Sequence, residues 1–295
     1  MRDFVIITDS TSDLTQQMRQ EYGVEYVKMN YVIDGVEYKA SLDWESHSVR
    51  EYYDLMRSGV RVFTTQIHRD VYREAFAAAV EAGKDVVYIS CSSALSASVN
   101  VARLVAQELM GEHPDAGIYC VDSLISSLGQ GYLVMEASRK RAEGMNAAET
   151  AAYIESIKLC VNQCGTVASL EYLRRSGRVK ASKAFFGNLF GVKPIIISDR
   201  KGQNYAYKKA KGIVNARIAI AEHIAQAADG RYDELLLTHA DCVEDIELLK
   251  EEILKIAPFK KVTVSTIGPI VGASVGPGTV IAFCHGKEVL IEGNE

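Results

Sequence analysis

A short local pattern recurs along the first half of this chain: a buried strand, a turn rich in hydroxyl groups, and then a helix. Turns of this kind lie at residues 8–13, 64–66, 90–98 and 122–127. Strands that alternate with helices favour a mostly parallel sheet with helices on both faces. Ligands of such sheets bind beyond the carboxyl ends of the strands. We therefore expect the four turns to meet at one edge of the sheet and to form a cleft that binds an anion or a hydroxyl group.

The second half has a different pattern, which indicates an α+β arrangement. A hairpin is expected over residues 192–207, and longer helices are expected over 213–228 and 243–256. We place the domain boundary near residue 162. This gives an N-terminal α/β domain over 1–162 and a C-terminal α+β domain over 163–295, with a ligand cleft between them.

Composition limits the classes of function. A net charge of −5 with 24% charged residues gives no electrostatic basis for binding nucleic acid. No apolar run approaches the roughly 20 residues of a membrane-spanning helix, and the chain enters a strand at once without a signal peptide. We therefore expect a cytoplasmic protein without stable membrane insertion.

The cysteines form no CxxC pair and the histidines form no HxH or HxxxH pair, which argues against a metal site.

The chain contains no phosphate-binding loop of its own. Neither GxxxxGK[ST] nor a GxGxxG that follows a strand is present, so kinase and NAD-dependent dehydrogenase activities are disfavoured and no cofactor is expected. The hydroxyl-rich loop over 90–98 instead joins a strand over 85–89 to a helix over 99–110. Backbone N–H groups and the positive end of the helix dipole point into such a loop, so a carboxylate or phosphate fits there. Plain helix capping by the serines is the alternative.

Residues 272–276 (GASVG) match the GxSxG motif of serine hydrolases. In those enzymes the serine stands on a sharp turn between a strand and a helix. Here a strand over 280–283 is expected after the motif, and only His285 follows the serine. A serine hydrolase that uses Ser274 stays an alternative function. The glycines around it are better explained by a tight loop whose backbone approaches a ligand or another segment of the chain.

Two further features bear on the cleft. The apolar segment over 184–192 is expected to form either a core helix or the wall of an apolar ligand pocket. His239 lies at the end of an expected strand and is the better cleft candidate among the histidines, although histidines in such positions more often have a structural role.

Taken in order, the motifs of this chain resemble those of the DegV family over nearly its whole length. The matching segments are residues 8–14, 64–66, 92–96, 122–123, 129–131, 170–173, 177–178, 238–240, 268–269 and 276–278. The resemblance implies a two-domain α/β protein that binds a long-chain fatty acid between its domains and has no catalytic turnover of its own. It further implies a separate ATP-dependent fatty acid kinase protein as partner, which phosphorylates the carboxylate while this protein holds the acyl chain.

The resemblance also implies roles for single residues. Thr64 and Ser96 are expected to hydrogen-bond the carboxylate, with the backbone N–H of Ala97 as a third donor. Ser93 and Ser123 are expected at the rim of the site. In this view the N-terminal domain carries the carboxylate-binding loops, and the C-terminal domain forms much of the acyl-chain pocket.

Two positions concern the partner and the head group. Arg178 belongs to the Gly-Arg motif of the family and is expected to meet the kinase; a solvated arginine at a helix end is the alternative. Ser274 stands where the family commonly has a histidine, so it can donate a hydrogen bond but not as a cation. Besides the serine hydrolase, a sensor of carboxylate ligands on the same fold stays open as a function.

Overall fold

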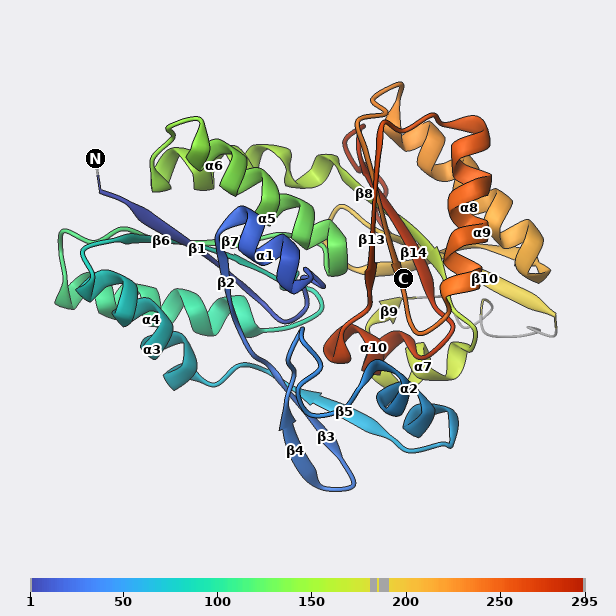
Figure 1. Ribbon diagram of the computed structural model, residues 1–295, viewed down its shortest axis with the longest axis horizontal. Helices are drawn as coiled ribbons and strands as arrows, with labels where there is room; N and C mark the ends of the chain where they lie inside the picture. The colour runs from blue at the N-terminus through green and yellow to red at the C-terminus, as the bar shows by residue number, and fades with distance from the viewer. Residues whose placement is uncertain (1, 181–184, 186–190, 294–295) are drawn as a thin grey trace.

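The computed structural model describes residues 2–180, 185 and 191–293. Figure 1 shows two lobes, with most of the N-terminal half of the chain on the left and the C-terminal half on the right. The expected α/β class is confirmed, because a parallel sheet is accompanied by a larger mixed sheet. The division into domains near residue 162 stays a prediction.

The sheet of the N-terminal lobe is entirely parallel. Its strands are β1 (Phe4–Asp9), β2 (Val24–Val27), β6 (Asp85–Ser90) and β7 (Ile118–Asp122), in the order β2-β1-β6-β7. Both faces are covered by helices, which is why the strands are nearly continuous apolar runs. On one face lie α3 (Arg69–Glu81) and α4 (Ser98–Glu112); on the other lie α1 (Gln16–Tyr22), α5 (Ser127–Ala142) and α6 (Ala147–Ile157), as Figure 1 shows. A 3₁₀ turn, Lys158–Cys160, follows α6.

A small antiparallel sheet lies below the two lobes in Figure 1. It contains β3 (Asn30–Ile33), β4 (Val36–Lys39) and β5 (Val62–Thr65) in the order β4-β3-β5, and α2 (Val49–Arg57) connects β4 to β5. The expected hairpin turn at Asp34 and Gly35 is present, with positive φ at both residues. The strand expected over 24–33 is divided between two sheets, with β2 in the parallel sheet and β3 in the small one. Between the two strands, Ser10 Oγ accepts a hydrogen bond from the amide of Met29 at 3.0 Å.

The sheet of the C-terminal lobe has seven strands of mixed direction. They are β8 (Val161–Thr166), β9 (Val179–Lys180), β10 (Val192–Ser198), β11 (Asn204–Lys211), β12 (Glu234–His239), β13 (Lys261–Thr266) and β14 (Val280–His285), in the order β13-β12-β14-β8-β10-β11-β9. The helices of this half are α7 (Leu170–Ser176), α8 (Gly212–Ala228), α9 (Val243–Ile256) and α10 (Pro269–Val275). The closing hairpin expected over 280–291 is not formed; β14 instead pairs with β12 and β8.

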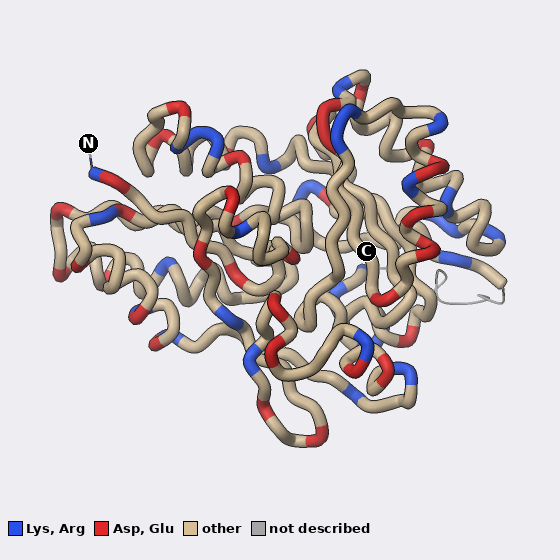
Figure 2. The backbone as a smooth tube through the Cα atoms, in the orientation of Figure 1, with Lys and Arg blue, Asp and Glu red and all other residues tan. Residues whose placement is uncertain are grey.

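The buried apolar side chains of the described residues form two clusters. The larger surrounds the parallel sheet and extends to Ile267 and Ile270 beside α10, so the lobes share one core there. The second lies between the mixed sheet and the helices α8 and α9. Figure 2 shows acidic and basic residues interspersed over both lobes. Within the described part of the chain, no helix combines the length and apolar character needed to cross a membrane.

Candidate functional site

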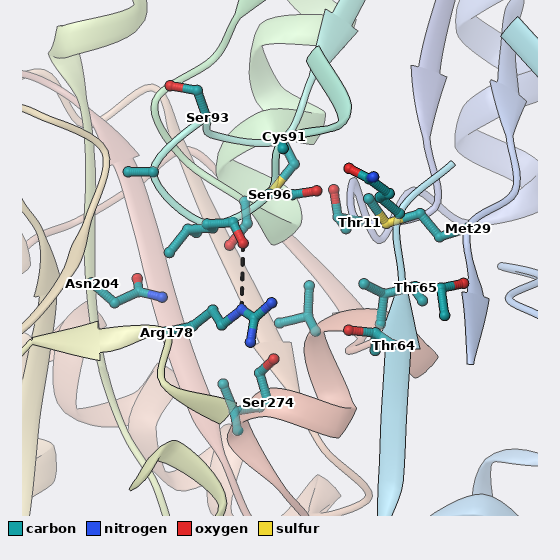
Figure 3. Close-up of a pocket in the computed structure, with 18 residues that line it drawn as sticks. Thr11, Met29, Thr64, Thr65, Cys91, Ser93, Ser96, Arg178, Asn204 and Ser274 are labelled. Carbon is teal, nitrogen blue, oxygen red and sulfur yellow. Dashed lines mark hydrogen bonds between the residues drawn. The ribbon is translucent and has the colours of Figure 1, made fainter. Parts of the chain in front are cut away.

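A pocket of about 480 Å³ lies between the loop after β6 and helix α10 (Figure 3). Its polar lining comes from both halves of the chain: Thr11, Thr64, Thr65, Gln66, Ser93, Ser96, Ser126, Arg178, Asn204 and Ser274. Its other lining residues are mostly apolar: Met29, Cys91, Ala94, Leu95, Ala97, Ile270, Val271 and Val275. The lining of the pocket therefore combines hydroxyl groups with apolar side chains.

Two buried carboxylates hold the loop that follows β6. Asp9, at the end of β1, accepts a hydrogen bond from the amide of Cys91 at 3.0 Å. Asp122, at the end of β7, accepts one from the amide of Ser93 at 3.0 Å. The sequence marks both acids only as members of polar turns. They acquire this role because β1 and β7 flank β6 in the sheet.

The structure brings four of the expected ligand-binding residues of the first half to this pocket: Thr64, Ser93, Ser96 and Ala97. Figure 3 shows Ser96 on the loop after β6 and Thr64 on β5, across the pocket from it. The hydroxyl of Ser96 lies 2.9 Å from Ser98 Oγ and accepts the amide of Ser98 at 3.3 Å. Ala97 is the N-cap of α4 and lines the pocket, so the N-terminus of this helix borders the pocket.

Ser123 lies elsewhere. It is buried, its hydroxyl donates to the carbonyl of Ile125 at 2.9 Å, and its amide donates to the carbonyl of Ser90. It fixes the end of β7 and does not line the pocket.

His239 is likewise buried and outside the lining; its Nδ1 accepts the amide of Cys242 at 3.3 Å, and burial lowers its pKa.

The apolar wall expected over 184–192 lies largely outside the described residues, which include only 185, 191 and 192 of that segment. The apolar wall that the structure does describe comes from α10, through Ile270, Val271 and Val275. The same helix corrects another expectation: instead of a tight glycine loop over 268–278, residues 269–275 form a helix.

Residues far away in the sequence hold α10 in place. The hydroxyl of Tyr52 donates to the carbonyl of Pro269 at 2.6 Å, and that of Tyr53 donates to the carbonyl of Ile267 at 2.6 Å. Ser274 stands near the end of this helix and lines the pocket. It is therefore not on a strand-to-helix turn. The described lining holds neither a histidine nor a carboxylate that could activate a nucleophilic serine.

The electrostatics of the pocket suit an anion. Arg178 is the only charged side chain among the described residues that line it. Its Nε donates to the carbonyl of Leu95 at 3.5 Å, the dashed line in Figure 3, so the guanidinium spans the mouth of the pocket. Burial raises the pKa of the Cys91 thiol, which therefore stays neutral. In the described part of the chain, no group of three or more His, Cys, Asp or Glu is placed to hold a metal ion.

A narrow cavity of about 30 Å³ adjoins the pocket and shares Ser126, Asn204, Val271 and Val275 with it. Its remaining walls are mostly apolar: Gln163, Gly165, Thr166, Val167, Leu173, Val179, Ile196, Thr279 and Ile281. Asn204 stands at the junction, and its Oδ1 accepts a hydrogen bond from Gln163 at 3.0 Å. A polar chamber that leads into an apolar seam is suited to a ligand with an acidic head and an apolar body.

The chain is similar to known proteins in both sequence and structure. The sequence model of the DegV family matches residues 3–285. A DegV domain-containing protein of Clostridium perfringens is 32% identical over 287 residues, which cover 97% of this chain and 98% of that protein. A fatty-acid-binding DegV family protein from Thermus thermophilus has a similar structure, with a TM-score of 0.88 and 28% identity over 97% of this chain and 100% of that one. DegV of Bacillus subtilis, a fatty acid binding protein, shares the fold with a TM-score of 0.84 and 22% identity, over 97% of this chain and 100% of that one.

Proposed function

The chain belongs to the DegV family, and we propose that it binds a long-chain fatty acid. The carboxylate occupies the hydroxyl-rich part of the 480 Å³ pocket, within reach of Thr64, Ser96 and Arg178. The acyl chain runs along α10 toward the apolar seam. The observation that carries this proposal is the junction of a polar, singly cationic chamber with an apolar cavity.

The two parts of the ligand contribute differently. A hydrogen bond to a charged group is worth about 1.5–3 kcal/mol net, and several are needed to offset the removal of a carboxylate from water. Each buried CH₂ contributes about 0.8 kcal/mol. The acyl chain therefore supplies most of the affinity, while the hydroxyl groups and Arg178 decide which end of the ligand faces the pocket mouth.

The apolar seam must widen when the ligand binds. Its volume of about 30 Å³ holds only about two or three water molecules, far less than an acyl chain needs. We propose that the acyl chain separates Val271 and Val275 of α10 from Leu173 and Ile281 on the other side of the seam. The length of acyl chain that fits is then set by how far these walls move.

We propose further that this protein presents the carboxylate to a separate ATP-dependent kinase. One carboxylate oxygen attacks the terminal phosphorus of ATP, an O–P bond forms, and the bond to the ADP oxygen breaks as ADP leaves with the electron pair. Two observations support this division of labour. The chain has no phosphate-binding loop, and Arg178 stands at the pocket mouth. A carboxylate sensor would share the binding step, but no residue of the site specifically favours it over presentation.

The binding proposal is tested by native mass spectrometry of the protein purified from bacteria. We expect a co-purifying species with the mass of a fatty acid. The double variant Thr64→Ala, Ser96→Ala should bind palmitate at least tenfold more weakly than the wild type, since it removes two hydrogen bonds.

A matched control is Ser156→Ala, which removes an exposed hydroxyl of α6 that donates to the carbonyl of Tyr153. This variant should bind palmitate like the wild type. A wild-type protein that is empty and does not take up added palmitate would overturn the proposed function. Undiminished binding by the double variant would overturn the assignment of the head-group site.

A further inference from the structure

A second chamber of about 250 Å³ lies directly outside the head-group pocket. The two spaces share Thr64, Arg178 and Ser274, so one opens onto the other across these side chains. The remaining walls of this outer chamber are Met56, Arg61, Val62, Phe63, Arg175, Ser176 and Ala273. Phe63 is 61% exposed, which places the outer chamber at the protein surface.

The outer chamber is cationic. Arg61, Arg175 and Arg178 all line it, and its described lining contains no Asp or Glu. Arg178 donates hydrogen bonds to two backbone carbonyls, those of Leu95 and Ser176, rather than to a carboxylate. Arg175 lies 4.9 Å above the ring of Tyr172 and makes an ion pair of 3.4 Å with Glu171. Among the described residues, Glu171 is therefore the one acidic side chain that forms an ion pair with any of these three arginines.

We propose that the outer chamber binds the phosphoryl group of an acyl phosphate, whose carbonyl and acyl chain remain in the head-group pocket. This inference rests on the proposed function and names the product that the site would hold. Phosphorylation of a carboxylate oxygen adds a phosphoryl group with up to two negative charges just beyond the carbonyl. The outer chamber adjoins the head-group pocket at Thr64, Ser274 and Arg178, the three side chains that line both spaces.

The side chains suit that group. Arginine presents several N–H donors in a plane and pairs with phosphate oxygens in a bidentate manner. Arg178 lies between the two spaces, so it can contact a free carboxylate and, after the reaction, the phosphoryl group. Arg61 and Arg175 lie only in the outer chamber and therefore distinguish the phosphorylated ligand from the free acid. Because the chamber is open to solvent, salt should weaken this added interaction.

The test compares two ligands on the same delipidated protein. One is palmitate. The other is 2-oxoheptadecylphosphonate, in which CH₂ replaces the bridging oxygen of palmitoyl phosphate and prevents hydrolysis. The dissociation constants are measured by isothermal titration calorimetry for the wild type and for the double variant Arg61→Gln, Arg175→Gln. Arg50→Gln is the matched control, since Arg50 is an exposed arginine of α2 that pairs with Asp54 and lines neither space.

We expect the double variant to bind the phosphonate roughly tenfold more weakly and palmitate with unchanged affinity. The loss should shrink as the salt concentration rises, and Arg50→Gln should affect neither ligand. If the ratio of the two dissociation constants were the same in the double variant as in the wild type, the inference would be overturned, but the proposed binding of fatty acids would not. Binding of neither ligand by the wild type would instead overturn the proposed function itself.

Discussion

The carboxylate of Asp13 accepts a hydrogen bond from the amide of Gly268, with 2.8 Å between Oδ1 and N. Gly268 is the N-cap of α10, the helix that carries the apolar wall of the pocket. The other oxygen of Asp13 accepts the hydroxyl of Ser127, the first residue of α5, at 2.5 Å. One buried carboxylate therefore joins the first turns of two helices that border the site.

Asp13 should make stability depend on pH. Burial raises its pKa to about 7, partly offset by the hydrogen bonds from Ser127 and Gly268. Because this pKa lies above that of the unfolded chain, the folded state binds the proton more tightly. The stability of the protein should therefore increase as pH falls from about 7 toward 4 and decrease as pH rises, by on the order of 4 kcal/mol for this group alone.

The substitution Asp13→Asn isolates this contribution. Asparagine keeps an oxygen that accepts the amide of Gly268, and it tolerates the positive φ of 52° at this position. We expect the variant to be more stable than the wild type at pH 8, and the difference to vanish near pH 4. Urea unfolding from pH 4 to 8.5 measures both curves. Two curves that run parallel over this range would contradict the role of Asp13.

Substitution by alanine should have opposite effects on stability at two glycines, because the surroundings of the added Cβ differ. A Cβ at Gly272 of α10 would lie 2.5 Å from the hydroxyl of Tyr53, which is buried and bonded to the carbonyl of Ile267. A Cβ at Gly111 of α4 would meet no atom within 4 Å. Gly272→Ala should cost about 1–3 kcal/mol of unfolding free energy through overpacking. Gly111→Ala should gain about 0.5–1 kcal/mol through helix propensity.

Chemical denaturation of the two alanine variants checks the signs, and palmitate binding adds a second readout. Gly272→Ala should also weaken binding, because it displaces the helix that carries Val271 and Val275. Gly111→Ala should leave binding unchanged. If both substitutions stabilised the protein, the close approach between α10 and α2 would be refuted.

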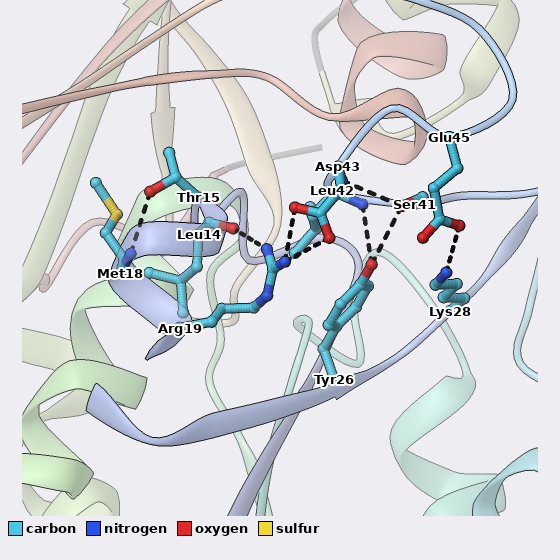
Figure 4. A network of polar contacts seen from close by, with 10 residues as sticks. All are labelled: Leu14, Thr15, Met18, Arg19, Tyr26, Lys28, Ser41, Leu42, Asp43 and Glu45. Carbon is cyan, nitrogen blue, oxygen red and sulfur yellow. Dashed lines mark hydrogen bonds and ion pairs between the residues drawn. The ribbon is translucent and has the colours of Figure 1, made fainter. Parts of the chain in front are cut away.

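Two neighbouring ion pairs should differ in strength (Figure 4). Arg19 donates through Nη2 to both oxygens of Asp43, at 2.7 and 2.6 Å, and through Nη1 to the carbonyl of Leu14 at 2.6 Å. Its side chain is 8% exposed. Lys28 pairs with Glu45 at 2.6 Å, but the two side chains are 28% and 57% exposed. Arg19→Met should therefore cost about 2 kcal/mol or more, and Lys28→Met less than about 1 kcal/mol.

Thermal unfolding at low and high salt separates the two ion pairs. The small effect of Lys28→Met should disappear at 1 M salt, where exposed charges are screened over about 3 Å. The effect of Arg19→Met should persist, since it includes the lost hydrogen bond to Leu14. Equal losses for both variants at low salt would show that burial does not set the strength of these pairs.

Local signals predict much of the fold. Apolar runs with hydroxyl-rich ends indicate β1, β6 and β7 and the helices after them, and the Asp34-Gly35 dipeptide indicates the small hairpin. The carboxyl ends of parallel strands meet at one edge, which is why Ser96 reaches the pocket as expected.

The rest depends on contacts between distant segments. Helix α10 contains Gly272 and is followed by Gly276, so its local propensity favours a loop. It is helical because Tyr52, Tyr53 and Asp13 fix its first residues from elsewhere in the chain. The roles of Asp9 and Asp122 follow from the order of the strands, which no local pattern encodes. Ser123 shows the converse, since a hydroxyl at a strand end can serve its own turn instead of the pocket.

Ser274 offers a test of where the head group lies. It stands at the junction of the pocket and the outer chamber, and the described lining of the pocket has no side chain that titrates between pH 6 and 8. Ser274→His would place an imidazole beside the proposed carboxylate. Its protonated form attracts the carboxylate, so palmitate affinity should rise about three- to tenfold from pH 8 to pH 6. Asp13 can also make palmitate affinity depend on pH, because it contacts α10, but this effect is common to both proteins. The quantity to measure is therefore the difference in pH dependence between the variant and the wild type. Fluorescence displacement at the two pH values provides it. An identical pH profile in both proteins would place the carboxylate away from Ser274, deeper toward Ser96.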